Sequence, residues 1–115
     1  MAAYLVIINN THNFEGLVES GYPKRSISLA EQFGAIYRHY SKNAEMIEGD
    51  AKWNGARPII IEFPDTESAR NFWFSPEYQE IRKLREPHCE LMAFLTDRPW
   101  MNENDAKEFI GSYLK

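Results

Sequence analysis

Three side chains on two strand-like segments have the right chemistry to bind and rearrange an oxygenated substrate. His39 lies within an aromatic, β-branched segment (35–41), and Arg57 and Glu62 belong to the most regular strand pattern of the chain, RPIIIEF (57–63). Because an imidazole titrates at about pH 6.5, His39 could act as a general acid or base. The Arg57 guanidinium could hold a carboxylate or an enolate, and Glu62 could be a base with a raised pKa.

Each of these side chains also has a structural alternative. His39 could lie on a half-exposed strand and bond to a carboxylate or a carbonyl. Arg57 could form an ion pair with one of three acidic side chains, Glu48, Asp50 or Glu62. Glu62, which interrupts an apolar run, could pair with Arg38 or with an arginine of a partner chain, because carboxylates are seldom buried unpaired. In that case it would fix the register of a dimer.

Aromatic residues provide the remaining candidates for ligand contact. Phe72, Trp73, Phe74 and Tyr78 gather near a predicted helix break, and such a cluster either lines a cleft for a flat ligand or forms core. Tyr78 is the best pocket candidate of the four because its hydroxyl needs a partner. Trp73 would contribute an apolar wall, and Tyr37, together with Tyr78, would orient the substrate.

Several classes of function are disfavoured by the sequence. The three histidines have no metal-binding spacing and Cys89 is the single cysteine, so we expect neither a metal site nor a disulfide. No glycine-rich nucleotide motif is present, and we expect no cofactor. The net charge of −4 argues against nucleic acid, and the longest apolar run is too short for a membrane span. The N-terminus predicts a strand rather than a signal peptide, and we expect a cytoplasmic protein.

The hydrophobic periodicity predicts one α+β domain over residues 1–115. Strands are expected at 3–9, 35–41, 57–63 and 89–95, with a further short strand starting at 44–48. Helical patterns cover 12–33 with a break at Gly21 and Pro23, then the two segments that follow Asp65 and Ser75, and finally 102–114 after a turn at 97–100. The order β-α-β-β-α-β is that of a ferredoxin-like fold, with helices on one face of a four-stranded antiparallel sheet.

This arrangement leaves the other face of the sheet uncovered. The cheapest cover for a chain of this size is a second copy, so we expect a homodimer through the sheet faces. Strict alternation along the second strand places Tyr37 and His39 on one face and Ile36, Arg38 and Tyr40 on the other. We expect the pocket between sheet and helices.

The chain resembles the bacterial DUF1330 family over residues 3–97. The resemblance rests on a leading AYLV strand, the EGD turn at 48–50, and the run IEFPDTESAR followed by SPEYQ. It implies a dimeric α+β barrel, a fold that antibiotic-biosynthesis monooxygenases and muconolactone isomerases share. Where family members carry an arginine before two glycines, this chain reads Tyr40-Ser41-Lys42, and the helix at 102–114 extends beyond the usual core.

Two functions follow from these observations. The first is a homodimer that binds a small aromatic or oxygenated metabolite, with cofactor-independent isomerase or monooxygenase chemistry in which His39 is the acid or base and Arg57 stabilises an oxyanion. The second is a non-catalytic binding or interaction module. A deep pocket lined by His39 and Arg57 favours the first function, and a pocket filled by Trp73 and Tyr78 favours the second.

Overall fold

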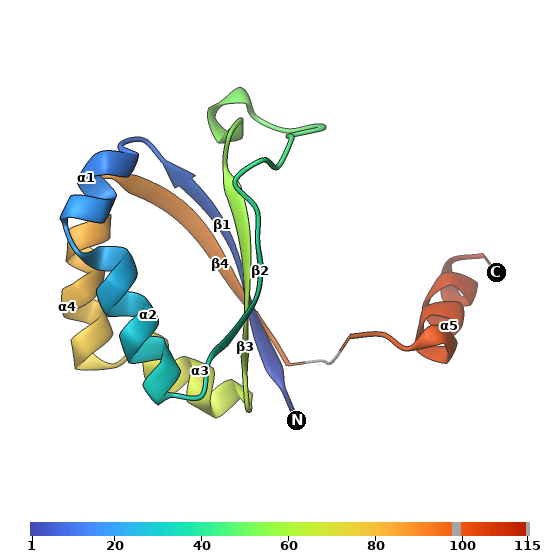
Figure 1. Cartoon of the computed structure of the whole chain (residues 1–115). Coiled ribbons are helices and arrows are strands. Elements are labelled where there is room, and N and C mark those ends of the chain that lie inside the picture. The colour runs from blue at the N-terminus through green and yellow to red at the C-terminus, as the bar shows by residue number, and fades with distance from the viewer. Residues whose placement is uncertain (98–99, 115) are drawn as a thin grey trace.

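The computed structural model describes residues 1–97 and 100–114 and has two layers, a sheet and a set of helices on one of its faces (Figure 1). The four antiparallel strands lie in the order β2-β3-β1-β4. The elements are β1 (Ala3–Thr11), α1 (Phe14–Glu19), α2 (Tyr22–Gln32), β2 (Ile36–Tyr40), the short 3-10 helix η1 (Ala51–Trp53), β3 (Arg57–Phe63), α3 (Thr66–Trp73), α4 (Pro76–Arg85), β4 (Cys89–Thr96) and α5 (Glu103–Tyr113). The predicted α+β fold is confirmed.

Local sequence signals set the helix boundaries. Gly21 adopts φ 82° between α1 and α2, and Pro23 lies in the first turn of α2, as expected from the predicted break. Asp65 caps α3 by accepting a hydrogen bond from the Ser68 backbone N–H at 2.7 Å. Ser75 caps α4 in the same way, through the Tyr78 N–H, and Pro76 begins the helix. The Asp65 cap thus begins α3 directly after β3, and the Ser75 cap separates α3 from α4.

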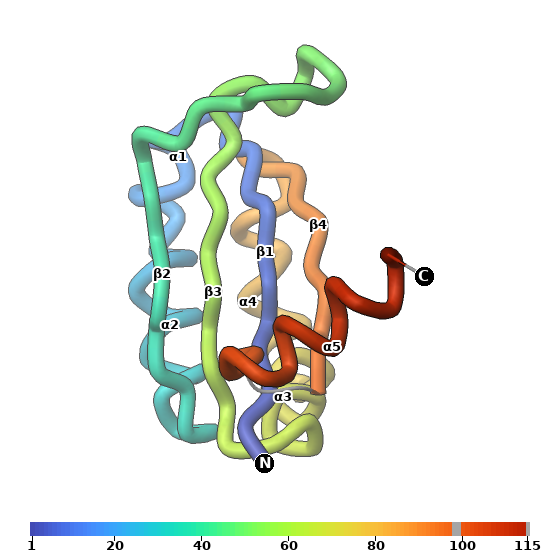
Figure 2. Tube along the Cα trace, turned by 90° about the vertical axis from the view of Figure 1, so that its right-hand side faces the viewer, coloured from blue at the N-terminus to red at the C-terminus, as the bar shows by residue number. Residues whose placement is uncertain are grey.

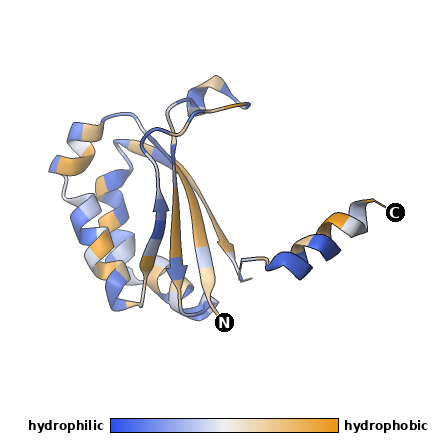
Figure 3. Cartoon of the chain, turned by 45° about the vertical axis from the view of Figure 1, so that its right-hand side comes forward, coloured by the Kyte–Doolittle hydropathy of each residue, from blue (hydrophilic) through white to orange (hydrophobic). Residues whose placement is uncertain are grey.

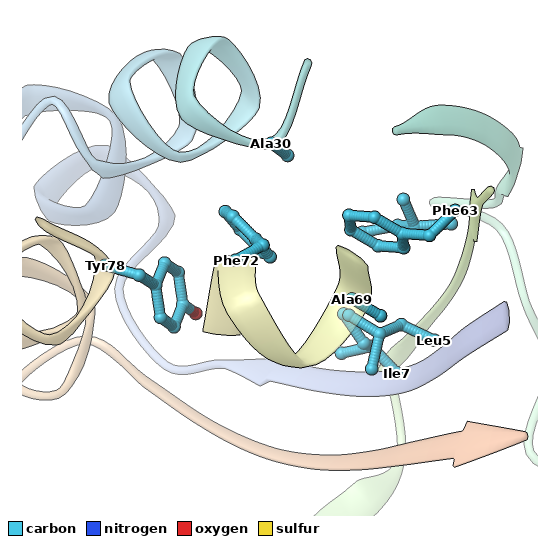
Figure 4. Packing of buried hydrophobic residues seen from close by; sticks show 8 residues of the cluster. Leu5, Ile7, Ala30, Phe63, Ala69, Phe72 and Tyr78 are labelled. Carbon is cyan, nitrogen blue, oxygen red and sulfur yellow. The ribbon is translucent and has the colours of Figure 1, made fainter. Parts of the chain in front are cut away.

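The core lies between the helix-facing side of the sheet and helices α2, α3 and α4 (Figure 4). Tyr78, Phe63 and Phe72 are its largest fully buried side chains. The Phe72 ring contacts both of the others, with ring centroids 5.7 Å from Phe63 and 4.8 Å from Tyr78. The core is thus centred on the lower part of the sheet in Figure 1, near α3, and aromatic packing fixes α3 and α4 against it.

A β-bulge in β2 corrects the predicted alternation of this strand. Tyr37 pairs with Ile61 and Tyr40 with Ile59, whereas His39 pairs with Ile60, and the register shifts between Tyr37 and His39. Because residues paired across a sheet share a face, Tyr37 and Tyr40 lie on the helix-facing side and His39 on the opposite side. One extra residue in the strand therefore exchanges the predicted faces of His39 and Tyr40.

Two other predicted elements differ from the structure. No strand forms at 44–48, where Ile47 is 85% exposed outside the sheet. The apolar pair Met46-Ile47 suggested a strand, but β2 ends at Tyr40 and the chain then runs as an irregular loop into η1. The turn predicted at 97–100 falls on residues 98 and 99, which lie outside the described residues.

The second face of the sheet, which we call the open face, carries no helix of the α1–α4 layer (Figure 2). It presents alternate residues of each strand, among them Ile36, Met92 and Phe94, which are 47%, 42% and 62% exposed. Helix α5 lies on this side, and in Figure 1 it stands clear of the sheet. In Figure 3, hydrophobic residues, drawn in orange, occur along the strands and in the C-terminal half of α5.

Candidate functional site

A cavity of about 380 Å³ lies between the helix-facing side of the sheet and helices α1 and α2. Its walls are mostly apolar, with a floor from all four strands and a roof from the two helices. The aliphatic residues are Ile7, Ile59, Ile61 and Leu91 from the sheet and Leu17, Val18 and Ile27 from the helices. A volume of this size falls within the range of small-molecule sites, about 300 to 1,000 Å³.

Arg57 provides the one positive charge among the residues that line this cavity. Its Nη1 donates a hydrogen bond to the Tyr40 hydroxyl at 2.7 Å, and its guanidinium carbon lies 4.8 Å from the centre of the Phe14 ring. Tyr40 and Phe14 also line the cavity. Of the acidic partners expected from the sequence, none forms an ion pair with Arg57 in residues 1–97 and 100–114. The cation is held in place by aromatic neighbours and keeps donors for an anionic ligand.

A pair of phenols closes another part of the cavity wall. Tyr22 lines the cavity, and its hydroxyl oxygen lies 2.7 Å from that of Tyr78, which is fully buried behind it. Burial and the neighbouring Tyr22 raise the pKa of Tyr78, and Arg85 opposes part of that rise. Arg85 is 6% exposed, with its guanidinium carbon 5.8 Å from the Tyr22 ring centre, and its Nε has no hydrogen-bond partner. A neutral phenol pair backed by a buried cation is therefore built into this wall.

Tyr37, one of the residues expected from the sequence to orient a substrate, lies in the cavity wall. Burial raises the pKa of its hydroxyl, and Tyr22 and Glu31 add to the rise. Tyr37 is therefore a neutral phenol at physiological pH and can donate or accept a hydrogen bond. Together with Tyr22 and Tyr40 it gives the cavity three phenols on otherwise aliphatic walls.

His39 and Glu62 lie on the open face, away from the cavity. His39 pairs with Ile60, whose sequence neighbours Ile59 and Ile61 line the cavity from the other side of the sheet. The bulge in β2 is the physical reason, and the acid–base role expected for His39 loses its geometric basis within one protomer. Arg38 donates a hydrogen bond to Glu62 at 3.1 Å, the ion pair considered from the sequence.

The charged pair on the open face has a third member. Tyr4 hydrogen-bonds to Glu62, and this bond, after that of Arg38, lowers the pKa of the carboxyl. The pKa of Tyr4 is raised, first by burial and then by Glu62. Glu62 is thus an ionised ion-pair partner at neutral pH rather than a base with a raised pKa.

Trp73 and Tyr78 belong to the aromatic core and not to the lining of the main cavity. Their ring centres lie 4.7 Å apart, and Tyr78 reaches the cavity only through its bond to Tyr22. Trp73 borders a smaller cavity of about 130 Å³ beside α3 and β4. The sequence also allowed this cluster to form part of the core, and Tyr78 does pack in the core.

The sequence interpretation missed several polar lining residues. Asn9 and Thr11 lie in β1 at alternate positions from Ile7, so continued alternation could have identified them. The Asn9 side-chain oxygen accepts a hydrogen bond from the Cys89 thiol, which fixes the orientation of the amide. Tyr22 follows the positive-φ Gly21 at the start of α2, and nothing local in the sequence indicates that it faces the sheet.

The described residues contain no cluster of three or more histidine, cysteine, aspartate or glutamate side chains able to hold a metal ion. In the same residues, none of the helices combines the length and the apolarity needed to cross a bilayer. Among the residues that line the cavity, the ionisable side chains are Arg57 and three tyrosines.

Comparison with known families and structures agrees with this architecture. Residues 2–97 match the model of a family described as a domain of unknown function, DUF1330. The match ends before α5. A comparison with curated proteins finds no match.

Three solved structures illustrate the fold similarity. The RPA0582 protein of unknown function from Rhodopseudomonas palustris is 14% identical, with a TM-score of 0.66, over 87% of this chain and 84% of that one. A dimeric ferredoxin-like protein of unknown function from Jannaschia sp. CCS1 is 11% identical, with a TM-score of 0.62, over 85% and 100%. SnoaB, a cofactor-independent oxygenase from Streptomyces nogalater, is 12% identical, with a TM-score of 0.57, over 89% and 97%.

Proposed function

The chain is a member of the DUF1330 family, and we propose that it binds a small aromatic or oxygenated metabolite, carrying an anionic group, in the cavity beneath α1 and α2. The observation that carries the proposal is that Arg57, which forms no ion pair with the described residues, lines a cavity with mostly apolar walls. A guanidinium there favours a carboxylate, a phenolate or an enolate, because a charge-assisted hydrogen bond is stronger than a neutral one.

The cavity walls determine the remainder of the ligand. Aliphatic side chains from β1, β3, α1 and α2 favour an apolar body, and the phenols of Tyr22 and Tyr37 provide hydrogen bonds to a ring substituent. The Phe14 ring lies beside the guanidinium and can stack against a flat ligand whose anionic group reaches Arg57. An aromatic acid with an oxygenated ring substituent meets all three requirements.

The test is a binding measurement with matched probes. We expect benzoate, salicylate and 4-hydroxybenzoate to bind and to raise the melting temperature, and benzamide to bind more weakly. Arg57→Gln weakens carboxylate binding by about 10- to 100-fold, as expected for the loss of a hydrogen bond to a charged group. Arg82→Gln serves as the matched control, because Arg82 pairs with Glu86 on α4 and does not line the cavity.

The proposal fails if Arg57→Gln and Arg82→Gln bind the carboxylates equally well. It also fails if benzamide and benzoate bind with the same affinity to the unaltered protein. Chemical-shift changes localised to β1, β3 and α2 distinguish cavity binding from surface binding.

Cofactor-independent oxygenation is the second candidate. It is favoured by the fold shared with SnoaB, together with a cavity in which a cation can stabilise an ionised substrate. In this chemistry the ionised substrate itself supplies the electrons to O₂. Because His39 lies on the open face, the substrate would have to ionise with the help of Arg57 alone. Oxygen uptake with a bound phenol that stops in Arg57→Gln would support this candidate, and binding without turnover leaves the non-catalytic binding module.

We also propose that two copies associate through their open faces. The support is that this face exposes apolar side chains of both edge strands, Ile36 of β2 and Met92 and Phe94 of β4, and carries the Arg38–Glu62 ion pair. The fold neighbour from Jannaschia is described as dimeric. Sedimentation at micromolar concentration is expected to give a dimer of the 13.5 kDa chain, and Phe94→Asp a monomer. A monomer in both cases would contradict the dimer.

A further inference from the structure

Helix α5 is well formed but unsupported by its own chain. Its N-terminus has a complete capping box, in which the Asn102 side chain accepts from the Asp105 N–H and the Asp105 side chain accepts from the Asn102 N–H. Figures 1 and 2 show it on the open-face side of the sheet, away from α1–α4. No strand or helix of the described residues packs extensively against it.

The sequence of α5 nevertheless has the pattern of a helix that packs. Ala106, Phe109, Ile110 and Tyr113 follow the spacing i, i+3, i+4, i+7 and form one stripe, which we call the α5 stripe. Phe109 and Ile110 are 50% and 53% exposed, and Tyr113 is 77% exposed. The Lys107–Glu103 ion pair, at 3.4 Å, lies to one side of this stripe. An amphipathic helix with its apolar side in water lacks its packing partner.

The short length of α5 makes such a partner necessary. Isolated helices below about 12 to 15 residues are marginal in water, even for sequences with high helix propensity. The 11 residues of α5 include Gly111 and Asn104, which lower that propensity further. The capping box stabilises the N-terminus of α5, but most of the stability of such a helix comes from burying its apolar face.

The open face of the sheet is too large for α5 to cover. An 11-residue helix is about 16 Å long and about 10 Å wide. The sheet has four strands about 4.8 Å apart, and the nine residues of β1 extend about 30 Å. Folding α5 back onto its own sheet would therefore leave most of the face exposed, whereas a second sheet would cover it.

The exposed apolar area matches the requirement of a dimer. Nine large apolar side chains on the open face, the connection after β4 and the C-terminal helix are more than 40% exposed: Ile36, Met92, Phe94, Trp100, Met101, Phe109, Ile110, Tyr113 and Leu114. At about 100 Å² each, they offer about 900 Å², close to the roughly 800 Å² per partner of a stable interface. The three exposed residues at the sheet offer about a third of that area, and the C-terminal segment offers the rest.

We propose that α5 is an exchange arm. A second copy of this chain covers the open face, and the α5 stripe packs against that copy. The inference rests on the proposed sheet-face dimer and adds the segment that lies outside the family match. In a twofold dimer each arm reaches the other subunit, so the contact forms twice. Trp100, whose ring centre lies 4.9 Å from that of Tyr4, anchors the start of the arm at the sheet.

A mixed-label dimer tests the direction of the contact. Uniformly ¹³C-labelled and unlabelled chains are mixed, and filtered nuclear Overhauser spectra record only contacts between subunits. We expect contacts from Phe109 and Ile110 of the labelled chain to the unlabelled chain. If the filtered spectra of the dimer contain no contacts from these side chains, the arm is overturned.

A matched pair of variants tests the energetic role of the arm in the full-length chain. Replacing Phe109 and Ile110 with Asn is expected to raise the dimer dissociation constant at least tenfold. The control replaces Lys107 and Glu108, which lie outside the α5 stripe, with Asn; it costs at least as much helix propensity and is expected to change the dissociation constant less than twofold. Equal effects in both variants would overturn the proposal.

The outcomes also separate the arm from the proposals on which it rests. A dimer that Phe94→Asp disrupts and the Phe109/Ile110 variant leaves intact removes the arm but keeps the sheet-face interface. If the unaltered protein is a monomer, both the arm and the sheet-face interface are excluded. Benzoate binding, measured on the same samples, reports on the cavity independently, because no residue of α5 lines it.

Discussion

The hydroxyl oxygens of Tyr22 and Tyr78 lie 2.7 Å apart and join the start of α2 to the first turn of α4. Tyr22 borders the cavity, and Tyr78 belongs to the core. The hydrogen bond between these two tyrosines therefore links the candidate ligand site to the hydrophobic core. Ligand binding at Tyr22 and packing around Tyr78 are expected to influence each other.

Tyr78→Phe should destabilise the protein by about 1 to 2 kcal/mol, because it removes the hydrogen bond without removing the ring. The effect should be smaller in a Tyr22→Phe background, since the partner hydroxyl is then already gone and only the interaction with Arg85 remains. Urea denaturation of the four proteins in this double-mutant cycle measures the coupling. Additive effects of the two substitutions would show that the bond contributes nothing to stability.

Stability should decrease in alkaline solution. Burial raises the pKa of Tyr78 in the folded chain above the ordinary value of about 10, so the folded state holds this proton more tightly than the unfolded state does. The resulting stabilisation is complete below about pH 10 and is lost as the pH rises toward the folded-state pKa. Tyr37 behaves in the same way.

Comparison with Tyr78→Phe isolates this contribution, because other ionisable groups are common to both proteins. Between about pH 9.5 and 11, the free energy of unfolding of Tyr78→Phe should fall less steeply than that of the unaltered chain. Parallel curves for the two proteins would contradict the assignment.

The bulge in β2 predicts opposite outcomes for adjacent residues. His39→Ala should leave benzoate affinity within about twofold, because His39 lies on the open face. Tyr40→Phe should weaken binding by about 3- to 10-fold, since it frees Arg57 from the hydrogen bond that orients it. Isothermal titration of both variants decides between this register and strict alternation, which predicts the reverse order.

Gly34 should be less tolerant of alanine than Gly55, although both adopt positive φ, at 85° and 91°. An added Cβ at Gly34 would lie 2.7 Å from Cγ of Pro64, whereas nothing lies within 4 Å of one at Gly55. Gly55→Ala is expected to cost about 1 kcal/mol, from the backbone conformation alone. Gly34→Ala should cost measurably more in urea denaturation, and equal losses would show that Pro64 moves aside freely.

The fold could be predicted from the sequence because its signals are local. Alternation defines the apolar strands, Ser75-Pro76 begins α4, and Gly21 marks the break between α1 and α2. The candidate site was predicted only in part. Arg57 and Tyr37 line the cavity, whereas His39, Glu62, Trp73 and Tyr78 do not.

The failures have specific physical causes. A bulge depends on the pairing of β2 with β3, and strict alternation within 36–40 contains no trace of it. Tyr22 reaches the cavity because α2 crosses the sheet at a particular angle, which is a property of tertiary packing. The segment at 44–48 has apolar residues but no neighbouring strand to pair with, so its composition alone predicted a strand that does not form.

The position of the bulge has a consequence for how this family member could diversify. β2 borders the sheet and bonds to a single neighbour, so its register is held less firmly than that of β1 or β3. Inserting or deleting one residue there would exchange which aromatic rings line the cavity while the buried interior stays untouched. The lining of the cavity can therefore change at this edge through small changes in chain length, without any substitution in the core.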